Sequence, residues 1–541
     1  MRRAIPYGLA LLFALCVVPN CGDDAATQPG EYSSGLVGAW YGESDLTNCK
    51  GADLIGTLEP VWSEKDDRGS EWSAKWEGSI TAPVSGEITL HVETAESAVV
   101  QIDGKQVVAV LEGQGRQSGT VSMRKGEAYP IVVTYSHEGG FDGFLTVKWS
   151  WRGQDETSVP ADNLRHTAEQ ARYWNWQPDP DPESIDFSKY VKARGKNLFV
   201  YKAPGRFGGW PANNGIWCWD NEIVVGFAQA YYKYSRYGHS WDGDRPELKV
   251  LARSLDGGET WTVEDPDNFV GDGLEPVPLT EPVNFAHPDF AMCCSVETFF
   301  ISYDRCRSWQ GPFDFPDFGT DDLSSRTDYI VNGRDDCLFF LSAKEERVEA
   351  ESQDRAFCAR TTDGGKTVEF LSWMTEEPIK ARSVMSSTVR ISDNELVSAM
   401  RRRHDVRRDN LPDITRNWID AYRSKDNGRT WEFLSKVADT DTGKQNGSPP
   451  ALVRLRDGRL CVAYGYRAVP LGIRAKISSD NGKTWGEEIH LRDDGATWDT
   501  GYPCMVQRPD GKLVTIYYFN TKEIPEQHIA ATIWDPDAVD Q

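Results

Sequence analysis

An eight-residue motif recurs five times in the second part of the chain. Residues 254–261, 424–431 and 478–485 each read Ser-x-Asp-x-Gly-x-Thr-Trp, and residues 302–309 and 361–368 are weaker copies. The five aspartates of these motifs are 48, 59, 63 and 54 residues apart. Repeats of this period, each preceded by an apolar strand-like run, indicate the four-stranded blades of a β-propeller.

The residues of the motif favour a structural role over a chemical one. Asp and Ser side chains bond the backbone of a tight hairpin, Gly supplies a positive φ, and Trp packs between neighbouring sheets. Five motifs and the closing segment 502–534 predict a six-bladed propeller over residues 190–541.

Composition restricts the function of the chain. The 541 residues include 83 Asp or Glu and 59 Lys or Arg, a formal charge of −24, and 11% are aromatic. Aromatic content this high argues against disorder, and the negative charge argues against non-specific nucleic-acid binding, which needs a cationic surface. A site for an anionic ligand must therefore carry its own local positive charge.

The N-terminus predicts export. Two arginines precede the mostly apolar stretch 4–18, which suits a secretory signal over residues 1–21 better than a membrane span. Cys21, followed by small and acidic residues, resembles the attachment cysteine of a bacterial lipoprotein, although the preceding residues match the usual pattern irregularly. Lipidation and simple cleavage both stay open, and we expect membrane association only through such an anchor.

Nine cysteines follow the signal, an odd number, so at least one lacks a partner within the chain. One or two disulfides would suit an exported protein. No Cys-x-x-Cys spacing occurs, and we expect neither a metal site nor an organic cofactor.

Residues 34–165 predict a β-sandwich of short strands separated by turns. Residues 35–41, 76–83, 100–105 and 145–149 resemble the carbohydrate-binding domain named after anthrax protective antigen. Family members that bind sugar through calcium have adjacent acidic residues where this chain has 93–97, Glu-Thr-Ala-Glu-Ser, so a spacer role is an equal alternative. The Pro-rich segment 177–182 predicts a stiff linker within residues 170–188.

The repeated motifs resemble the Asp-box sialidase superfamily over about 350 residues. The resemblance implies three arginines that hold a sugar carboxylate, a Tyr nucleophile and an Asp acid/base, and Arg forks suit a carboxylate because they offer paired donors. Position by position it implies Tyr502 as nucleophile, with Asp242 or Asp244 as acid/base. The implied clamp is Arg206, one arginine of 401–403 (here Arg402), and Arg467 with Arg474 as competitor.

One element of the family pattern is absent from the sequence. The Glu that activates the Tyr is expected early in the fourth blade, where residues 383–390 contain no carboxylate. Without a base, a Tyr of pKa about 10 is a poor nucleophile at neutral pH. His287, Asp328 and Arg326 open neighbouring blades, so they are further candidates for the same pocket, and a structural role for His287 is the alternative.

These patterns predict an all-β protein, an N-terminal β-sandwich followed by a six-bladed β-propeller. We expect an exported sialidase-like exo-glycosidase that acts on a terminal acidic sugar of external glycans. Two alternatives stay open: another acidic-sugar hydrolase or lyase, or a non-catalytic glycan-binding surface protein.

Overall fold

The structure, a computed structural model, describes residues 32–540. The ranges 64–65, 178–179, 181–183, 236–237, 271–273, 346–353, 376–380 and 444–445 and the single residues 67 and 141 are excepted. The expected signal 1–21 with Cys21, and part of the expected linker, lie outside the described residues. Among the residues described, no helix is long and apolar enough to cross a membrane.

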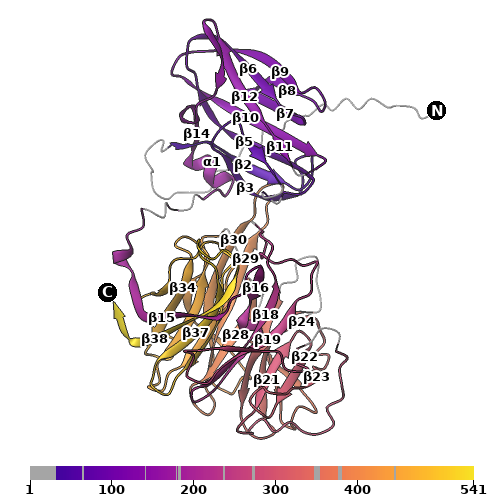
Figure 1. The fold of residues 1–541 in the computed structure, drawn as a ribbon, viewed down its shortest axis with the longest axis vertical. Coiled ribbons are helices and arrows are strands. Elements are labelled where there is room, and N and C mark those ends of the chain that lie inside the picture. The colour runs from indigo at the N-terminus through magenta and orange to yellow at the C-terminus, as the bar shows by residue number, and fades with distance from the viewer. Residues whose placement is uncertain are drawn as a thin grey trace, which may run out of the picture.

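The N-terminal domain is a β-sandwich (Figure 1). One sheet runs β1-β14-β5-β10-β7-β8, with β2 and β3 added through β5, and the other runs β13-β12-β6-β9. A short β4–β11 pair accompanies them. The strands are β1 (Tyr32–Ser34), β2 (Leu36–Tyr41), β3 (Cys49–Ile55), β4 (Val61–Trp62), β5 (Glu71–Thr81), β6 (Gly86–Glu93), β7 (Ser97–Ile102), β8 (Lys105–Val110), β9 (Arg116–Met123), β10 (Ala128–Glu138), β11 (Gly143–Phe144), β12 (Thr146–Trp151), β13 (Gln154–Ser158) and β14 (Leu164–Thr167).

Alternating burial explains how these strands form two layers. In β10 the buried residues are every second one, from Ile131 to His137, which is the period of a strand that covers a core on one side. The core between the sheets is rich in Trp, including Trp62, Trp72, Trp76 and Trp149. After the sandwich, the short helix α1 (Ala168–Tyr173) begins at Thr167, whose side chain caps it.

Six blades follow, as the motif spacing predicted (Figure 1). Blade 1 contains β16 (Arg206–Gly209), β17 (Ile216–Trp219), β18 (Glu222–Tyr231), β19 (Leu248–Ser254) and β20 (Thr262–Glu264), and blade 2 contains β21 (Ala291–Ser295), β22 (Thr298–Ser302) and β23 (Gln310–Asp314). Blade 3 contains β24 (Thr320–Val331), β25 (Cys337–Glu345), β26 (Asp354–Thr361) and β27 (Glu369–Trp373), and blade 4 contains β28 (Arg382–Arg390), β29 (Leu396–Val406), β30 (Ile414–Ser424) and β31 (Glu432–Asp439). Blade 5 contains β32 (Pro450–Arg454), β33 (Leu460–Tyr466), β34 (Gly472–Ser478) and β35 (Ile489–Arg492).

Blade 6 joins the two ends of the propeller. Its strands β36 (Gly501–Gln507), β37 (Leu513–Phe519) and β38 (His528–Asp540) are completed by β15 (Val191–Tyr201), the first strand of the domain. The β15 strand pairs antiparallel with β38 and also pairs briefly with β35 of blade 5. The ring is therefore closed by main-chain hydrogen bonds between segments more than 300 residues apart in sequence.

The five repeated motifs form the same turn in each blade. In the first copy, Asp256 accepts hydrogen bonds from the Thr260 backbone N–H (2.9 Å) and hydroxyl (2.6 Å), and Ser254 Oγ accepts from Gly258 N–H. The same bonds to the aspartate recur at the other four copies. Partial burial opposes ionisation of Asp256, but the hydrogen bonds outweigh it and lower the pKa to about 2, as they do at Asp480. The motif is a structural staple, as its composition indicated.

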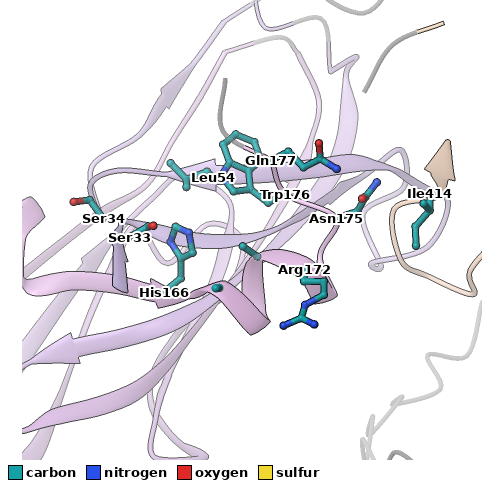
Figure 2. Close-up of a pocket in the computed structure, with 11 residues that line it drawn as sticks. Ser33, Ser34, Leu54, His166, Arg172, Asn175, Trp176, Gln177 and Ile414 are labelled. Atoms are coloured by element: carbon teal, nitrogen blue, oxygen red, sulfur yellow. The ribbon is translucent and has the colours of Figure 1, made fainter. Parts of the chain in front are cut away.

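A long hairpin of blade 4 reaches the sandwich (Figure 1). At its tip Arg408 donates to the Tyr173 carbonyl (2.9 Å), and Leu411 packs beside the cluster of Val37 and Trp174. A cavity of about 610 Å³ lies at this junction, between the sandwich and Ile414 of β30 (Figure 2). The arginine-rich segment 401–408 thus ends in an interdomain contact.

The expected disulfides are not formed. All nine cysteines from Cys49 to Cys504 carry free thiols, and seven of them are buried. The seven buried cysteines lie in the interior of blades 2, 3, 5 and 6, and burial raises the pKa of the Cys293 thiol to about 12. The thiols behave as small apolar side chains of the core.

Candidate functional site

The candidate site lies at the centre of the propeller, on the face where Tyr502 begins the inner strand of blade 6. The inner strand of blade 1 is interrupted there by the short helix α2 (Pro211–Asn214). This helix packs against β21, β24 and β36, the inner strands of three other blades. It therefore occupies the middle of the ring and leaves a cavity to one side.

A cavity of about 510 Å³ opens between α2 and blades 2 and 3. Tyr502, Arg326 and Met385 form one part of its wall, and Asn213 and Lys249 are also among its lining residues. Several serines and threonines of β21, β22, β24 and β25 line it too, including Ser325, whose hydroxyl is buried without a hydrogen-bond partner among the described residues. The wall is rich in polar groups, as a site for a hydroxylated ligand requires.

The structure decides which arginine of 401–403 faces Tyr502. Arg401 lies with its Nη1 3.4 Å from Tyr502 Oη, whereas Arg402 on the opposite face of β29 donates to the Tyr422 hydroxyl (3.1 Å). The choice of Arg402 for the clamp is therefore corrected to Arg401. Arg403 pairs with Asp405.

Arg326 and Arg467 also lie beside Tyr502. Arg326 is 7% exposed and its Nη1 donates to the carbonyls of Met385 and Pro450, at 3.3 Å each. The Arg467 guanidinium lies 5.5 Å from the centre of the Tyr502 ring, and its Nη2 donates to the Tyr518 hydroxyl. Further bonds from Arg467 go to backbone carbonyls, which fix it in place.

Two other predicted clamp residues lie elsewhere. Arg206 stacks on the Tyr231 ring, 3.9 Å from its centre, and is not part of the cavity wall. Arg474 donates hydrogen bonds to the carbonyls of Pro470 and Arg492, and its Nε lies 3.4 Å from Glu488 Oε1. The structure therefore gathers Arg467 of the expected clamp, the further candidate Arg326, and Arg401 around Tyr502.

The charges of this cluster are poorly compensated. No ion pair joins Arg326, Arg401 or Arg467 to a carboxylate in the described part of the chain, and the Nε atoms of Arg326 and Arg401 are buried without a hydrogen-bond partner there. Burial, with a smaller contribution from the nearby Arg467, lowers the pKa of Arg401 to about 10. Buried donors without acceptors are costly, so they mark a place where a ligand can supply the acceptors.

The two remaining candidates from neighbouring blades, Asp328 and His287, lie in different surroundings. Asp328 is buried on β24 and accepts hydrogen bonds from Ser386 Oγ (2.9 Å) and Thr388, and burial raises the pKa of its carboxyl to about 6. His287 instead lies beside Tyr303, and its Nδ1 accepts from the Asp289 N–H. Asp289 pairs with Arg305 of a repeated motif, so His287 lies beside that motif and is not among the residues that line the cavity of Tyr502.

Met385 lies where the resemblance implies a Glu. Its Sδ is 3.8 Å from Arg401 Nη1, and a register shift between Val384 and Ser387 sets it out of the regular strand. Both Met385 and Tyr502 have positive φ, 56° and 48°, as do Val270 and Val296 on the same cavity wall. Each such residue costs on the order of 1–3 kcal/mol, and backbone strain of this kind clusters at functional sites.

The loop expected to supply the acid/base places neither its aspartates nor His239 on the cavity wall, and it brings His239 beside Asp499. Asp242 accepts from the Asp244 N–H and lies 4.0 Å from Lys233 Nζ, and neither aspartate lines the cavity. In the same loop His239 Nδ1 lies 2.5 Å from Oδ1 of Asp499. Sequence reasoning missed this pair because 260 residues separate its members and neither stands in a motif. The nearness of Asp499 to Tyr502 in the chain was the only signal.

Two family models match the chain. A PA14 domain matches residues 33–164 and a BNR repeat-like domain matches residues 301–515. No curated protein matches it. A protein of unknown function from Dyadobacter fermentans has a TM-score of 0.46 and 20% identity, covering 64% of this chain and 99% of that one.

Two other solved structures are more distant. A mutant of Trypanosoma rangeli sialidase that displays trans-sialidase activity has a TM-score of 0.39 and 11% identity, covering 64% of this chain and 59% of that one. The Epa9A adhesin domain of Candida glabrata, in complex with Galb1-4GlcNAc, has a TM-score of 0.23 and 10% identity, covering 26% and 93%. The chain thus joins a PA14 domain to a BNR repeat-like propeller, as the sequence resemblance implied.

Proposed function

We propose that this PA14 and BNR-repeat chain is an exo-glycosidase that acts on a terminal acidic sugar of external glycans. The domain pair supports action on, or binding of, glycans in general. Tyr502 would be the nucleophile, and Arg326 and Arg401 would receive the sugar carboxylate. Glycosidases of the sialidase type use a Tyr nucleophile in place of a carboxylate.

The observation that carries the proposal is the cationic wall beside Tyr502, in which Arg401 has no ion pair with a carboxylate among the described residues. Asp328 partly offsets the charge of Arg326, but a buried arginine without a carboxylate contact, such as Arg401, is expensive. A carboxylate ligand relieves that cost by forming charge-assisted, forked hydrogen bonds. Arg401 Nη1 also lies 3.4 Å from Tyr502 Oη, so a sugar whose carboxylate binds Arg401 lies next to the proposed nucleophile.

Hydrolysis assays test this proposal. The purified protein is incubated with a fluorogenic sialoside and with a panel of uronate-capped glycans between about pH 4 and pH 8, the range in which acid/base groups of glycosidases titrate. We expect turnover of at least one acidic glycoside, with a loss of about 10³-fold or more in kcat for Tyr502→Phe, since covalent catalysis then has no nucleophile. No turnover of any acidic glycoside by the wild type would sink the proposal.

Tyr517→Phe is the matched control for Tyr502→Phe. Tyr517 belongs to the same blade and is buried, but its hydroxyl bonds Thr532 inside the sheet. We expect this variant to keep wild-type activity. An equal loss in both variants would show that the blade, and not the Tyr502 hydroxyl, is what the substitution damages.

A non-catalytic glycan-binding protein is the second candidate. It is favoured by one observation: Met385, a residue without a titrating group, stands on the wall where the resemblance implies the activating Glu. Binding of an acidic glycan that depends on Arg401, with no product formed, would support this candidate. Growth of the absorbance of an unsaturated uronate would indicate a lyase instead.

Export is part of the same proposal. It is supported by the apolar stretch 4–18 after two arginines, and Cys21 is the residue that would carry a lipid anchor. Fractionation of cells that express the chain with Cys21 or with Cys21→Ala tests it. An anchored protein moves from the membrane to the soluble fraction on substitution, and a simply cleaved one does not change.

A further inference from the structure

A histidine and a buried aspartate form a pair on the same face of the propeller as Tyr502. His239 Nδ1 lies 2.5 Å from Asp499 Oδ1, and the His239 side chain is 28% exposed while that of Asp499 is 2% exposed. Among the described residues no hydrogen bond to His239 Nε2 is formed. The pair thus has one anchored nitrogen and one that solvent or a ligand can reach.

Asp499 is held in place from several directions. Besides His239, it accepts hydrogen bonds from the Ser240 N–H (2.9 Å), the Tyr518 hydroxyl (2.7 Å) and Gln527 Nε2 (3.0 Å). A carboxylate with this many donors stays fixed and orients the imidazole that it contacts. The arrangement is far more elaborate than packing of a surface histidine requires.

The pair is continuous with the Tyr502 site. The Tyr518 hydroxyl that donates to Asp499 also accepts from Arg467 Nη2 (2.9 Å). The Tyr518 and Tyr502 rings lie 5.9 Å apart, and the Arg467 guanidinium lies over the Tyr502 ring. Trp498 contacts both parts of the site: its ring centre lies 5.5 Å from that of His239 and 5.3 Å from the Arg467 guanidinium.

In the described part of the chain, Asp499 is the charged group hydrogen-bonded to this imidazole. Asp499 is in direct contact with the imidazole, and Arg467 and Tyr518 lie behind Asp499. Asp499 and Glu526 also interact electrostatically with Tyr232, which directly follows β18. Trp210 and Trp498 supply the apolar sides. An imidazole that is fixed through one nitrogen by a carboxylate and open at the other is suited to acid/base work.

We propose that His239 is the proton-transfer residue of this site, with Asp499 as its positioning residue; this inference rests on the proposed function. In the first step the Tyr502 oxygen forms a bond to the anomeric carbon and its phenol proton passes to water. The bond from that carbon to the leaving oxygen breaks, and the electron pair stays on the oxygen. The leaving oxygen takes the Nε2 proton of the His239 imidazolium.

The second step reverses these transfers. Water forms a bond to the anomeric carbon and gives its proton to the neutral His239 Nε2. The bond between that carbon and Tyr502 breaks, its electron pair returns to the Tyr oxygen, and a solvent proton restores the phenol. The sum is hydrolysis, with the imidazolium and Tyr502 regenerated.

Leaving-group dependence tests this role. His239→Gln is compared with the wild type on two glycosides of the same acidic sugar, one with an activated nitrophenyl leaving group and one with a sugar leaving group. We expect kcat/KM to fall about 10²–10⁴-fold for the sugar leaving group and less than about tenfold for nitrophenyl, which departs without a proton.

Two more variants complete the experiment. Asp499→Asn should show the same leaving-group pattern more weakly, because the imidazole remains but is oriented less well. His528→Gln, at a buried imidazole whose Nδ1 contacts the Glu526 carbonyl, should change the hydrolysis of neither substrate. If His239→Gln does not fold, His239→Asn takes its place.

Each outcome decides the inference. An equal fall on both substrates in His239→Gln, or no fall on either while Tyr502→Phe is inactive, overturns the role of His239 and leaves the proposed function standing. A wild type that hydrolyses no acidic glycoside overturns both.

Discussion

Neighbouring arginines of β29 have opposite electrostatic environments. Arg402 lies 3.7 Å from Asp420 and bonds Tyr422, so its charge belongs to the fold. Arg401 is 4% exposed, and it contacts the neutral groups of Asn446, Met385 and Tyr502. Stability alone does not explain a buried cation with neutral partners, and a ligand of opposite charge does.

Replacement of Arg401 should therefore separate stability from ligand binding. We expect Arg401→Leu to keep or raise the free energy of unfolding, by up to about 1 kcal/mol, because an uncompensated buried charge is removed. Asn446 Oδ1 keeps its bond to Arg403 Nη1 (3.0 Å) in this variant. Affinity for an acidic glycan should fall by about tenfold or more, since a charge-assisted bond is lost. Chemical denaturation and calorimetric titration measure the two effects.

Arg402→Leu is the matched control for Arg401→Leu. It leaves Asp420 buried with less compensation, so we expect the free energy of unfolding to fall by about 2–4 kcal/mol and the affinity of the folded protein to be unchanged. The same stability loss in both variants would contradict the distinction between the two faces of β29.

At this scale the sequence predicted kinds of residue better than positions. It indicated that one arginine of 401–403 faces inward, but alternate strand residues point to opposite sides and the pattern does not say which side is the axis. The register shift at Met385 and the left-handed backbone of Tyr502 are set by tertiary packing, which leaves no local signal. The contact between His239 and Asp499 is hidden for the same reason.

At the scale of elements, the repeated turn was the most predictable feature, since its bonds are all within a few residues. Asp480 accepts from Thr484 N–H (2.9 Å), Thr484 Oγ1 (2.7 Å) and Ser478 Oγ (2.8 Å). These donors stabilise the charged form, so the pKa of Asp480 falls from 3.8 to about 2. Such a group adds stability above its unfolded pKa and loses it as the pH falls through its folded pKa.

Asp480→Ala should therefore destabilise the propeller in a pH-dependent way. We expect a loss of about 1 kcal/mol at about pH 7 from the missing hydrogen bonds. The difference from the wild type should shrink between about pH 4 and pH 2, where the native carboxylate becomes protonated. Thermal unfolding across this range measures it. Glu487→Ala, at an exposed position after the turn, should show no such trend.

The hairpin of blade 4 is an element whose length the repeat did not predict. Its strands β29 and β30 extend beyond the sheet, and residues 407–413 contact the sandwich through Arg408 and Leu411. We expect replacement of 407–413 by Asn-Gly, a two-residue turn, to release the sandwich and raise the radius of gyration in small-angle X-ray scattering. Each domain should keep its own thermal transition. An unchanged radius would show that other contacts hold the domains together.

For the whole molecule, the blade count and the order of the two domains followed from the sequence, because motif spacing and strand patterns persist along the chain. The way the ring closes did not. Residues 191–201 contain no repeated motif, and β15 belongs to blade 6 only because it pairs with β38 from the other end of the domain. The blade to which such a strand belongs is set by the strand with which it pairs, so its own residues do not indicate it.

Closure of the ring depends on the pairing of β15 with β38. A chain shortened to begin at Ala203 lacks β15 and leaves β38 as an open edge next to β35, so we expect it to aggregate or to be recovered unfolded. A chain that begins at Tyr190 keeps β15 but lacks the sandwich, and we expect it to be monomeric, with a cooperative thermal transition. Size-exclusion chromatography and calorimetry of the two chains distinguish them. Equal folding of both would mean that the inner strands alone close the ring, contrary to the eight-stranded sheet that β15 joins.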